Sequence, residues 1–360
     1  MISGENYLKF APRVFFKHGL PLQLIFFVTA KCNLRCRHCF YSHEIERKKE
    51  ELTLAEIEMI AKNSKLNLLW LLLTGGEPFL RADLAEIASA FCRYGKVANI
   101  SIPTNGQMKK ETIAIVRNML KLCPDTFISI SVSLDGTEKI NDNIRNLNGA
   151  FSKTIDTFLE LKKFKSFSNF GLSLQTTMNF ENQNDLKKLY YFARDELKPD
   201  YFNLNLIRGS PKDQKLSNVD VEYYEELLDL IEKDTKKGKW DYFKFPFSKI
   251  ALARNLLVYK QIAGCFRKKQ FLTPCYSSNL SGVINETGNV FPCEILQNSK
   301  IGNLKEVNYN LSKLWFSPRN NEIRKRIAQN CFCTYECAMS INVLFNLRFY
   351  PEIILQSFNY

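Results

Sequence analysis

Between residues 22 and 209, short apolar runs alternate with segments that repeat apolar residues at helical spacing. This alternation constrains the fold more than any other feature, because short apolar runs of this length are typical of buried strands. Strands joined by crossover helices pair in parallel. Six strand–helix units therefore predict an α/β fold, a partial (β/α)6 barrel, with strands at 22–29, 68–74, 97–104, 127–136, 171–179 and 201–209.

The loops after the expected strands carry the polar residues that chemistry needs. Thr53 and Glu56 have capping-box spacing, so a helix is expected to begin there. In parallel α/β folds ligands bind at the carboxyl ends of the strands. We therefore expect the Cys, Gly, Glu, Asn, Asp and Arg residues of these loops to share one face of the molecule.

The composition changes along the chain and suggests how it is divided. Charged helical patterns follow the last expected strand, and six of the eleven cysteines lie after Gly264. A small cysteine-organised domain is thus expected at the C-terminal end. The predicted division is an N-terminal extension (1–21), the partial barrel (22–210), a helical bridge (211–264), the cysteine-rich domain (265–345) and a C-terminal tail (346–360).

Several classes of protein are excluded by composition. Apolar runs of the length needed to span a bilayer are missing, and the N-terminus lacks the pattern of a secretory signal. For a chain that is not exported, an odd count of eleven cysteines points to metal ligation or reactive thiols rather than disulfides. The sequence therefore predicts a cytoplasmic protein.

The net charge of +13 would suit an anionic partner, but the basic residues are spread along the chain. Solvated faces explain most of this charge, so nucleic acid is not favoured as a partner. Segments 10–19 and 341–358 mix aromatic residues with cations. They are compatible with lying on a membrane surface, although packing against the rest of the protein is the favoured interpretation.

The most specific motif is KCNLRCRHCF, which places Cys32, Cys36 and Cys39 directly after the first expected strand. Three thiolates on one tight loop can hold three corners of an iron–sulfur cube and leave one iron without a protein ligand. A metal centre with an open position is a reactive centre. A zinc site with a distant fourth ligand is the alternative that spacing alone leaves open.

The second motif, Gly75-Gly76-Glu77-Pro78, follows the next expected strand and should lie on the same rim as the cysteines. The two glycines would let the backbone approach a ligand closely. The carboxylate of Glu77 could bind an ammonium group.

Together these motifs resemble the radical S-adenosylmethionine (SAM) superfamily over residues 22–210. The resemblance implies that Cys32, Cys36 and Cys39 hold a [4Fe–4S] cluster whose open iron is chelated by SAM. It also implies a set of SAM-binding positions. These are His38 near the adenine, Gly75, Gly76 and Glu77 at the methionine amino group, Ser133 and Asp135 near the ribose and amino acid, Arg145 at the carboxylate and, as weaker candidates, the strand-end residues Asn105, Thr177 and Asn205.

The C-terminal cysteines form a second pattern. Cys275 and Cys293 flank a predicted hairpin with its turn at 286–289, and Cys331, Cys333 and Cys337 follow as C-x-C-x3-C. This region resembles the SPASM/twitch extension of the superfamily but departs from the full SPASM spacing. The resemblance implies one auxiliary [4Fe–4S] cluster held by four of these five cysteines, with Cys265 a weaker sixth candidate. A zinc ribbon is the alternative.

The resemblance implies an oxidoreductase-type enzyme with an electron donor such as flavodoxin or ferredoxin. In this superfamily the reduced cluster cleaves SAM to a 5′-deoxyadenosyl radical, which abstracts a hydrogen atom from the substrate. Modification of a peptide or protein, by crosslinking or oxidation, is the favoured reaction. The alternatives are a twitch-type dehydrogenase or epimerase of a small carbohydrate, and a non-catalytic iron–sulfur or zinc scaffold. The sequence assigns no catalytic acid or base.

Overall fold

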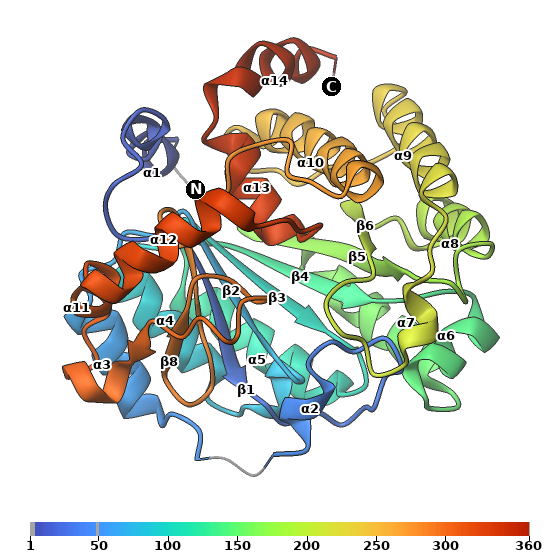
Figure 1. Ribbon diagram of the computed structural model, residues 1–360. Helices are drawn as coiled ribbons and strands as arrows, with labels where there is room; N and C mark the ends of the chain where they lie inside the picture. Colours follow the sequence, from blue (N-terminus) through green and yellow to red (C-terminus); the bar gives the residue numbers. More distant parts are fainter. Residues whose placement is uncertain (1–3, 48–49, 360) are drawn as a thin grey trace.

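The computed structural model describes residues 4–47 and 50–359 and is built around one nine-stranded sheet (Figure 1). The sheet has the order β6-β5-β4-β3-β2-β1-β7-β8-β9, and neighbouring strands from β6 to β7 are parallel. The partial barrel expected from the sequence is thereby confirmed. Its six strands are β1 (Gln23–Thr29), β2 (Trp70–Gly75), β3 (Asn99–Thr104), β4 (Phe127–Ser133), β5 (Phe170–Met178) and β6 (Tyr201–Leu206).

Crossover helices pack against the outer face of the sheet and bury the apolar stripe that the sequence pattern predicted (Figure 1). The first begins at the capping box of Thr53 and Glu56, in which both reciprocal hydrogen bonds form. The helices that connect or flank the six strands are α2 (Ser42–Ile45), α3 (Leu54–Asn63), α4 (Leu84–Gly95), α5 (Lys109–Leu122), α6 (Glu138–Arg145), α7 (Ala150–Lys162) and α8 (Leu186–Phe192).

The inner face of the sheet encloses a space that we call the lumen. In β3, for example, Ile100 and Ile102 are buried against the helices, whereas Asn99 and Ser101 face the lumen and stay partly exposed. Hydroxyl groups form hydrogen bonds across the inner face, as between the side chains of Ser101 and Ser129 (2.8 Å). The lumen is therefore lined by polar groups in its middle part rather than filled by a second apolar core.

The C-terminal region completes the sheet instead of standing apart from it. The predicted hairpin forms β7 (Ser281–Ile284) and β8 (Asn289–Phe291), and β7 pairs in parallel with β1. The helix α10 runs through residue 264, where the sequence analysis placed a domain boundary. The remaining elements are α1 (Glu5–Leu8), α9 (Val221–Lys236), α10 (Ser248–Lys268), β9 (Gly302–Asn303), α11 (Leu311–Trp315), α12 (Pro318–Asn330), α13 (Glu336–Leu344) and α14 (Tyr350–Ser357).

The two aromatic terminal segments pack only in part against the body of the protein, and Phe15, Phe16, Leu355 and Phe358 remain exposed. Phe10 and Val14 share a buried cluster with Ile341 and Phe345 of the C-terminal region. The C-terminal helix α14 lies on α10. No helix in the described parts of the chain combines the length and apolarity required to cross a membrane.

Candidate active site

The three cysteines of the first motif lie on the loop between β1 and α2 and face one cavity of about 160 Å³. The hydrogen bond from the Cys39 N–H to the Cys36 carbonyl (3.3 Å) tightens this loop. Burial raises the pKa of the Cys32 thiol to about 11 and that of Cys39 to about 12. A metal centre bound here must therefore displace thiol protons.

The Gly75-Gly76 turn lies directly on the cysteine loop, and its contacts leave no room for side chains. The Gly76 and Glu77 N–H groups donate to the carbonyls of Thr29 and Lys31 (2.9 and 2.8 Å). A Cβ atom on Gly75 or Gly76 would lie 2.1 Å from one of these carbonyl oxygens. Gly75 also has a φ of +142°, which favours glycine. Close packing of two loop backbones thus explains both glycines.

Glu77 is buried at the bottom of this turn, and its carboxylate accepts three hydrogen bonds. The donors are the Asn105 N–H (2.7 Å), the Thr104 hydroxyl (3.0 Å) and the Phe79 N–H (3.2 Å). Burial raises the pKa of Glu77 to about 7, although these hydrogen bonds act in the opposite direction. No cation of the described residues forms an ion pair with this buried carboxylate, which can therefore bind an ammonium group.

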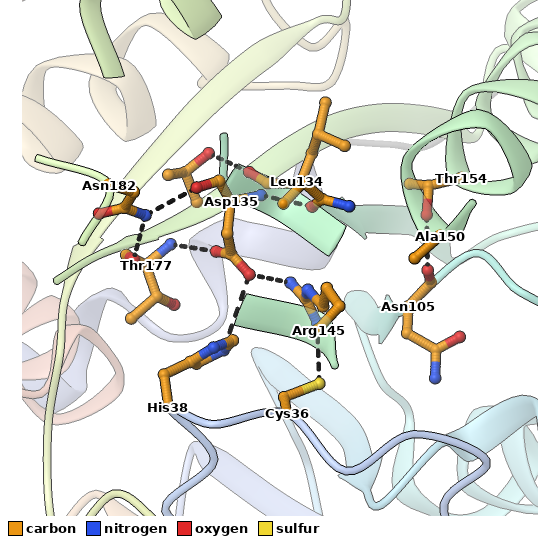
Figure 2. A network of polar contacts seen from close by, with 12 residues as sticks. Cys36, His38, Asn105, Leu134, Asp135, Arg145, Ala150, Thr154, Thr177 and Asn182 are labelled. Atoms are coloured by element: carbon orange, nitrogen blue, oxygen red, sulfur yellow. Dashed lines mark hydrogen bonds and ion pairs between the residues drawn. The ribbon is translucent and has the colours of Figure 1, made fainter. Parts of the chain in front are cut away.

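Asp135 organises another wall of this site through its contacts with Thr177, Arg145 and His38, as Figure 2 shows. One carboxylate oxygen accepts from the Thr177 N–H (2.9 Å), and the other lies 2.5 Å from Arg145 and 3.7 Å from His38. Arg145 in turn points at Cys36, with its Nη1 3.9 Å from the sulfur (Figure 2). Asp135 in the loop after β4 and Arg145 at the end of α6 therefore form a buried ion pair directly behind the cysteine site.

Two buried polar atoms of this wall have no hydrogen-bond partner among the described residues: His38 Nδ1 and Arg145 Nε. Burial lowers the pKa of His38 to about 4, so the ring is neutral at ordinary pH. Neutral imidazole can either donate or accept at Nδ1. The free donor and acceptor positions indicate that this wall can bind a polar ligand in addition to a metal centre.

The structure brings most of the predicted SAM-binding residues to the same cavity. Cys32, Cys36, Cys39, His38, Gly75, Gly76, Glu77, Asn105, Ser133, Arg145 and Thr177 all line it. Asp135 instead lies behind Arg145 and His38, and Asn205 is buried away from the cavity. We therefore propose that Asp135 positions its two neighbours rather than contacting SAM.

Sequence reasoning missed other residues at this site. Glu51 accepts from the Thr29 hydroxyl and the Ala30 N–H (both 2.8 Å) and so fixes the start of the cysteine loop. Gln175 and Arg208 line the cavity from β5 and from the loop after β6. Their position at the carboxyl ends of strands was a signal that could have identified Gln175 and Arg208.

A second cysteine site lies beside β1 and β7. Cys275, Cys293, Cys331 and Cys333 line one narrow cavity, together with Ile25 of β1. The hairpin β7–β8 brings Cys275 and Cys293 together, as predicted, and the segment after α12 supplies the other two. Cys265 is buried in the apolar face of α10 instead.

Cys337, the fifth candidate, does not line that cavity. Its thiol is hydrogen-bonded to Glu294 and lies near Arg208 and Glu336. Arg208 forms an ion pair with Glu336. Burial raises the pKa of Glu294 and Glu336. The side chain of Cys337 thus belongs to a buried polar cluster between the two cysteine sites.

Aromatic rings connect the two sites. Phe40 follows Cys39, Tyr335 lies two residues after Cys333, and their ring centroids are 6.1 Å apart. The Arg208 guanidinium lies over both rings, 5.4 and 4.6 Å from their centroids. Phe40, Tyr335 and Arg208 therefore connect the two cysteine sites, which are separate cavities.

Comparison with known sequence families agrees with this geometry. The profile of the radical SAM superfamily matches residues 26–193, and that of the SPASM iron–sulfur cluster-binding domain matches residues 275–338. Together the two matches cover well over half of the chain. The protein belongs to the radical SAM superfamily and carries a C-terminal SPASM domain.

Curated relatives of this chain act in different processes. It is 30% identical over 217 residues to the Fe-coproporphyrin III synthase of Methanosarcina barkeri, a match that covers 58% of the chain and half of that protein. Identity to the AdoMet-dependent heme synthase of the same organism is 28%, over 79% of the chain and 80% of the relative. The subtilosin biosynthesis protein AlbA of Bacillus subtilis is 28% identical over 46% of the chain and 34% of its own length.

Among solved structures, the fold is similar to that of Streptococcus suis SuiB bound to its precursor peptide SuiA. The TM-score is 0.61 with 18% sequence identity, and the similarity covers 89% of this chain and 70% of SuiB. At this identity the likeness supports the shared fold.

The residues present fit the cofactors of the family, which are a SAM-binding [4Fe–4S] cluster, SAM itself and auxiliary iron–sulfur clusters. Three thiols can supply three iron ligands at the first site, and four thiols gather at the second. Glu77 and the free polar atoms of His38 and Arg145 match the ammonium and polar groups of SAM.

Proposed function

We propose that this radical SAM enzyme abstracts a hydrogen atom from a substrate in the lumen and thereby modifies a peptide or protein side chain. The observation that carries the proposal is that both cysteine sites open on the same side of one sheet, beside a polar lumen. The 28% identity to AlbA, a protein of bacteriocin biosynthesis, supports a peptide substrate. When bound, the cluster and SAM supply the one-electron chemistry that makes the radical.

The residues of the chain bind and orient these groups. In this proposal Cys32, Cys36 and Cys39 hold the SAM-binding cluster. Glu77 binds the ammonium group of SAM, and Arg145 its carboxylate, since both side chains face the same cavity. The buried walls keep water and oxygen from the reacting centre.

A carboxylated tetrapyrrole is the second candidate substrate. The specific observation is the match to the AdoMet-dependent heme synthase, which spans about four fifths of both proteins. An experiment separates the two candidates. Anaerobically reconstituted enzyme is reduced with dithionite, supplied with SAM, and incubated with Fe-coproporphyrin III or with a peptide library.

Formation of 5′-deoxyadenosine together with a mass change in a peptide would support peptide modification. Formation of 5′-deoxyadenosine together with a mass change in the porphyrin alone would instead support the tetrapyrrole as the substrate. A reconstituted enzyme that forms no 5′-deoxyadenosine under any of these conditions would contradict the proposed function as a whole.

The pH dependence of SAM binding tests the role of Glu77. The carboxyl group is charged above its pKa, which burial raises to about 7, and neutral below it. We therefore expect SAM to bind more weakly at pH below about 7 and to reach constant affinity above it, because only the carboxylate attracts the ammonium group. Titration calorimetry of the reconstituted protein across this range measures the effect. The Glu77→Gln variant should bind SAM with an affinity that does not change with pH. If the pH dependence of SAM binding persisted in this variant, Glu77 would not be its source.

Iron content tests which cysteines hold the auxiliary cluster. We propose Cys275, Cys293, Cys331 and Cys333, because these four share one cavity. Wild-type protein should then contain about eight irons per chain and Cys333→Ser about four. Cys337→Ser is the matched control, four residues away, and should keep about eight. The reverse result for the two variants would assign Cys337 as a ligand in place of Cys333.

A further inference from the structure

Arg254 is a buried cation at the closed end of the lumen, outside the site described above. It lies on α10 and is 9% exposed. Its guanidinium carbon is 5.5 Å from the ring centroid of Trp70, the first residue of β2. Tyr201, the first residue of β6, is also close enough to act electrostatically on the pKa of Arg254. Arg254 therefore sits at the amino ends of the strands, opposite the cysteine sites.

The surroundings of Arg254 are part of the lumen. Trp70 faces inward, since its indole N–H donates to the Ser101 hydroxyl (2.7 Å) on the inner face of β3. Beyond it, polar side chains continue along the inner face toward the SAM-binding cavity, which Gln175 and Ser133 line. The members of this polar row are Ser101, Ser129, Ser131, Ser173, Gln175 and Asn203.

The described residues offer Arg254 no counter-charge. In the described parts of the chain no carboxylate lies within ion-pair distance of it, and its Nε has no hydrogen-bond acceptor. The titratable groups that act on it are Tyr201, Tyr242 and Tyr259, and burial lowers its pKa. By contrast Arg145, Arg194 and Arg208 are each paired with a carboxylate.

An unpaired buried charge is unfavourable unless a ligand of opposite charge pairs with it. A guanidinium that lies over an aromatic ring still presents N–H groups as a fork that matches a carboxylate or phosphate. We propose that Arg254 binds an anionic group of the substrate, a carboxylate in the first instance, at the closed end of the lumen. This inference rests on the proposed function, because it assumes that the substrate occupies the lumen.

The distance along the sheet limits the substrate further. Trp70 and Gly75 are the two ends of β2. Five steps of strand separate Arg254 from the SAM-binding cavity by about 16 Å. A substrate that reaches both must be elongated and must carry its anionic group far from the carbon that loses hydrogen. An acidic side chain of a peptide and a propionate of a tetrapyrrole both meet this requirement.

Small anions test the site without turnover, so the result does not depend on SAM cleavage. Glutarate and inorganic phosphate are titrated into the reconstituted protein with SAM, and binding is measured by calorimetry. We expect saturable binding of glutarate, little binding of its neutral analogue glutaramide, and at least about a tenfold loss of glutarate affinity in Arg254→Gln.

Arg324→Gln is the matched control. Arg324 also lies over a tryptophan, 5.7 Å from the Trp315 centroid, but its guanidinium donates to the carbonyls of Ser278 and Trp315 and to the amide oxygen of Asn321. This variant should bind glutarate like wild type. If thermal melting shows that Arg254→Gln does not fold, the comparison of glutarate with glutaramide in wild-type protein still tests whether the site requires an anionic group.

Three binding results would overturn the proposal, and a fourth comes from the competition described next: the three are no saturable binding of either anion, equal binding of glutarate and glutaramide, or unchanged affinity in a folded Arg254→Gln protein. Competition then identifies the source of the anionic group. Displacement of glutarate by coproporphyrin III indicates a tetrapyrrole, and displacement by an acidic peptide indicates a peptide. If neither competes, Arg254 is not a substrate anchor. A wild-type enzyme that binds glutarate but cleaves no SAM would contradict the proposed function alone.

Discussion

Replacing Cys36 with Ala is expected to abolish SAM cleavage while the protein stays folded. The thiol is buried at the centre of the cysteine loop and lies 3.9 Å from the Arg145 guanidinium. If the three cysteines of this loop are the only protein ligands of the SAM-binding cluster, two thiols cannot retain it. We expect reconstituted Cys36→Ala to contain about four irons in place of about eight and to form 5′-deoxyadenosine only at background level.

The fold should survive this change, because the described structure around β1 is held by strand pairing and a packed core rather than by the loop alone. Thermal unfolding of the metal-free variant and of metal-free wild type measures this directly. Cys92→Ala serves as the control, since the Cys92 thiol contacts Thr126 on the outer side of the sheet, away from both sites. If Cys36→Ala kept SAM cleavage, the assignment of the loop as the cluster site would be wrong.

The sheet was predictable from the sequence because its signals are local. Each inner strand is a short apolar run, each crossover helix has its own apolar stripe, and the Thr53–Glu56 capping box forms as the spacing indicated. In a parallel sheet the ends of such strands must share one edge. The gathering of the cysteine loop and Glu77 therefore followed from chain order, whereas Arg145 was placed there only by the family resemblance.

Other features depend on contacts between distant segments and could not be predicted. Helix α6 contains only two strongly apolar residues, Ile140 and Ile144, so periodicity gave it no signal although it positions Arg145. The pairing of β7 with β1 joins residues more than 250 positions apart. Which four cysteines converge depends on that pairing.

The burial of Arg254 also depends on contacts between distant segments and could not be predicted from the sequence. Its segment was expected to form a charged helical bridge with solvated cations, and α10 does contain such residues. The side chain that turns into the lumen cannot be told from its neighbours by sequence, because its burial depends on Trp70 and Tyr201 at the starts of two strands. Charge patterns locate solvated faces well and isolated buried charges poorly.

The ion pair of Arg145 with Asp135 leads to the second large expected effect, which is on stability. Both side chains are buried, and their closest nitrogen and oxygen lie 2.5 Å apart. Removing one member of a buried pair leaves the other charge uncompensated and costs about 3–5 kcal/mol. Arg145→Met should therefore lower the free energy of unfolding by this amount at about pH 8. Urea denaturation of the metal-free protein measures it, and Asp135→Leu combined with Arg145→Met should recover most of the loss.

His38 gives this prediction a pH dependence. Its Nε2 lies 3.7 Å from the Asp135 carboxylate; burial lowers its pKa to about 4, an effect that Arg145 reinforces and Asp135 opposes. Without Arg145 the pKa of His38 should rise, because Asp135 then attracts the imidazolium unopposed. A raised folded-state pKa contributes stability that is present at low pH and lost as pH increases through it. Arg145→Met should consequently lose less stability at about pH 5 than at about pH 8. An equal loss of unfolding free energy at both pH values would mean that His38 does not replace the missing guanidinium. The double variant Arg145→Met/His38→Gln is the control. If its loss of stability disappeared at about pH 5 and not at about pH 8, the ion-pair account of this wall would be wrong.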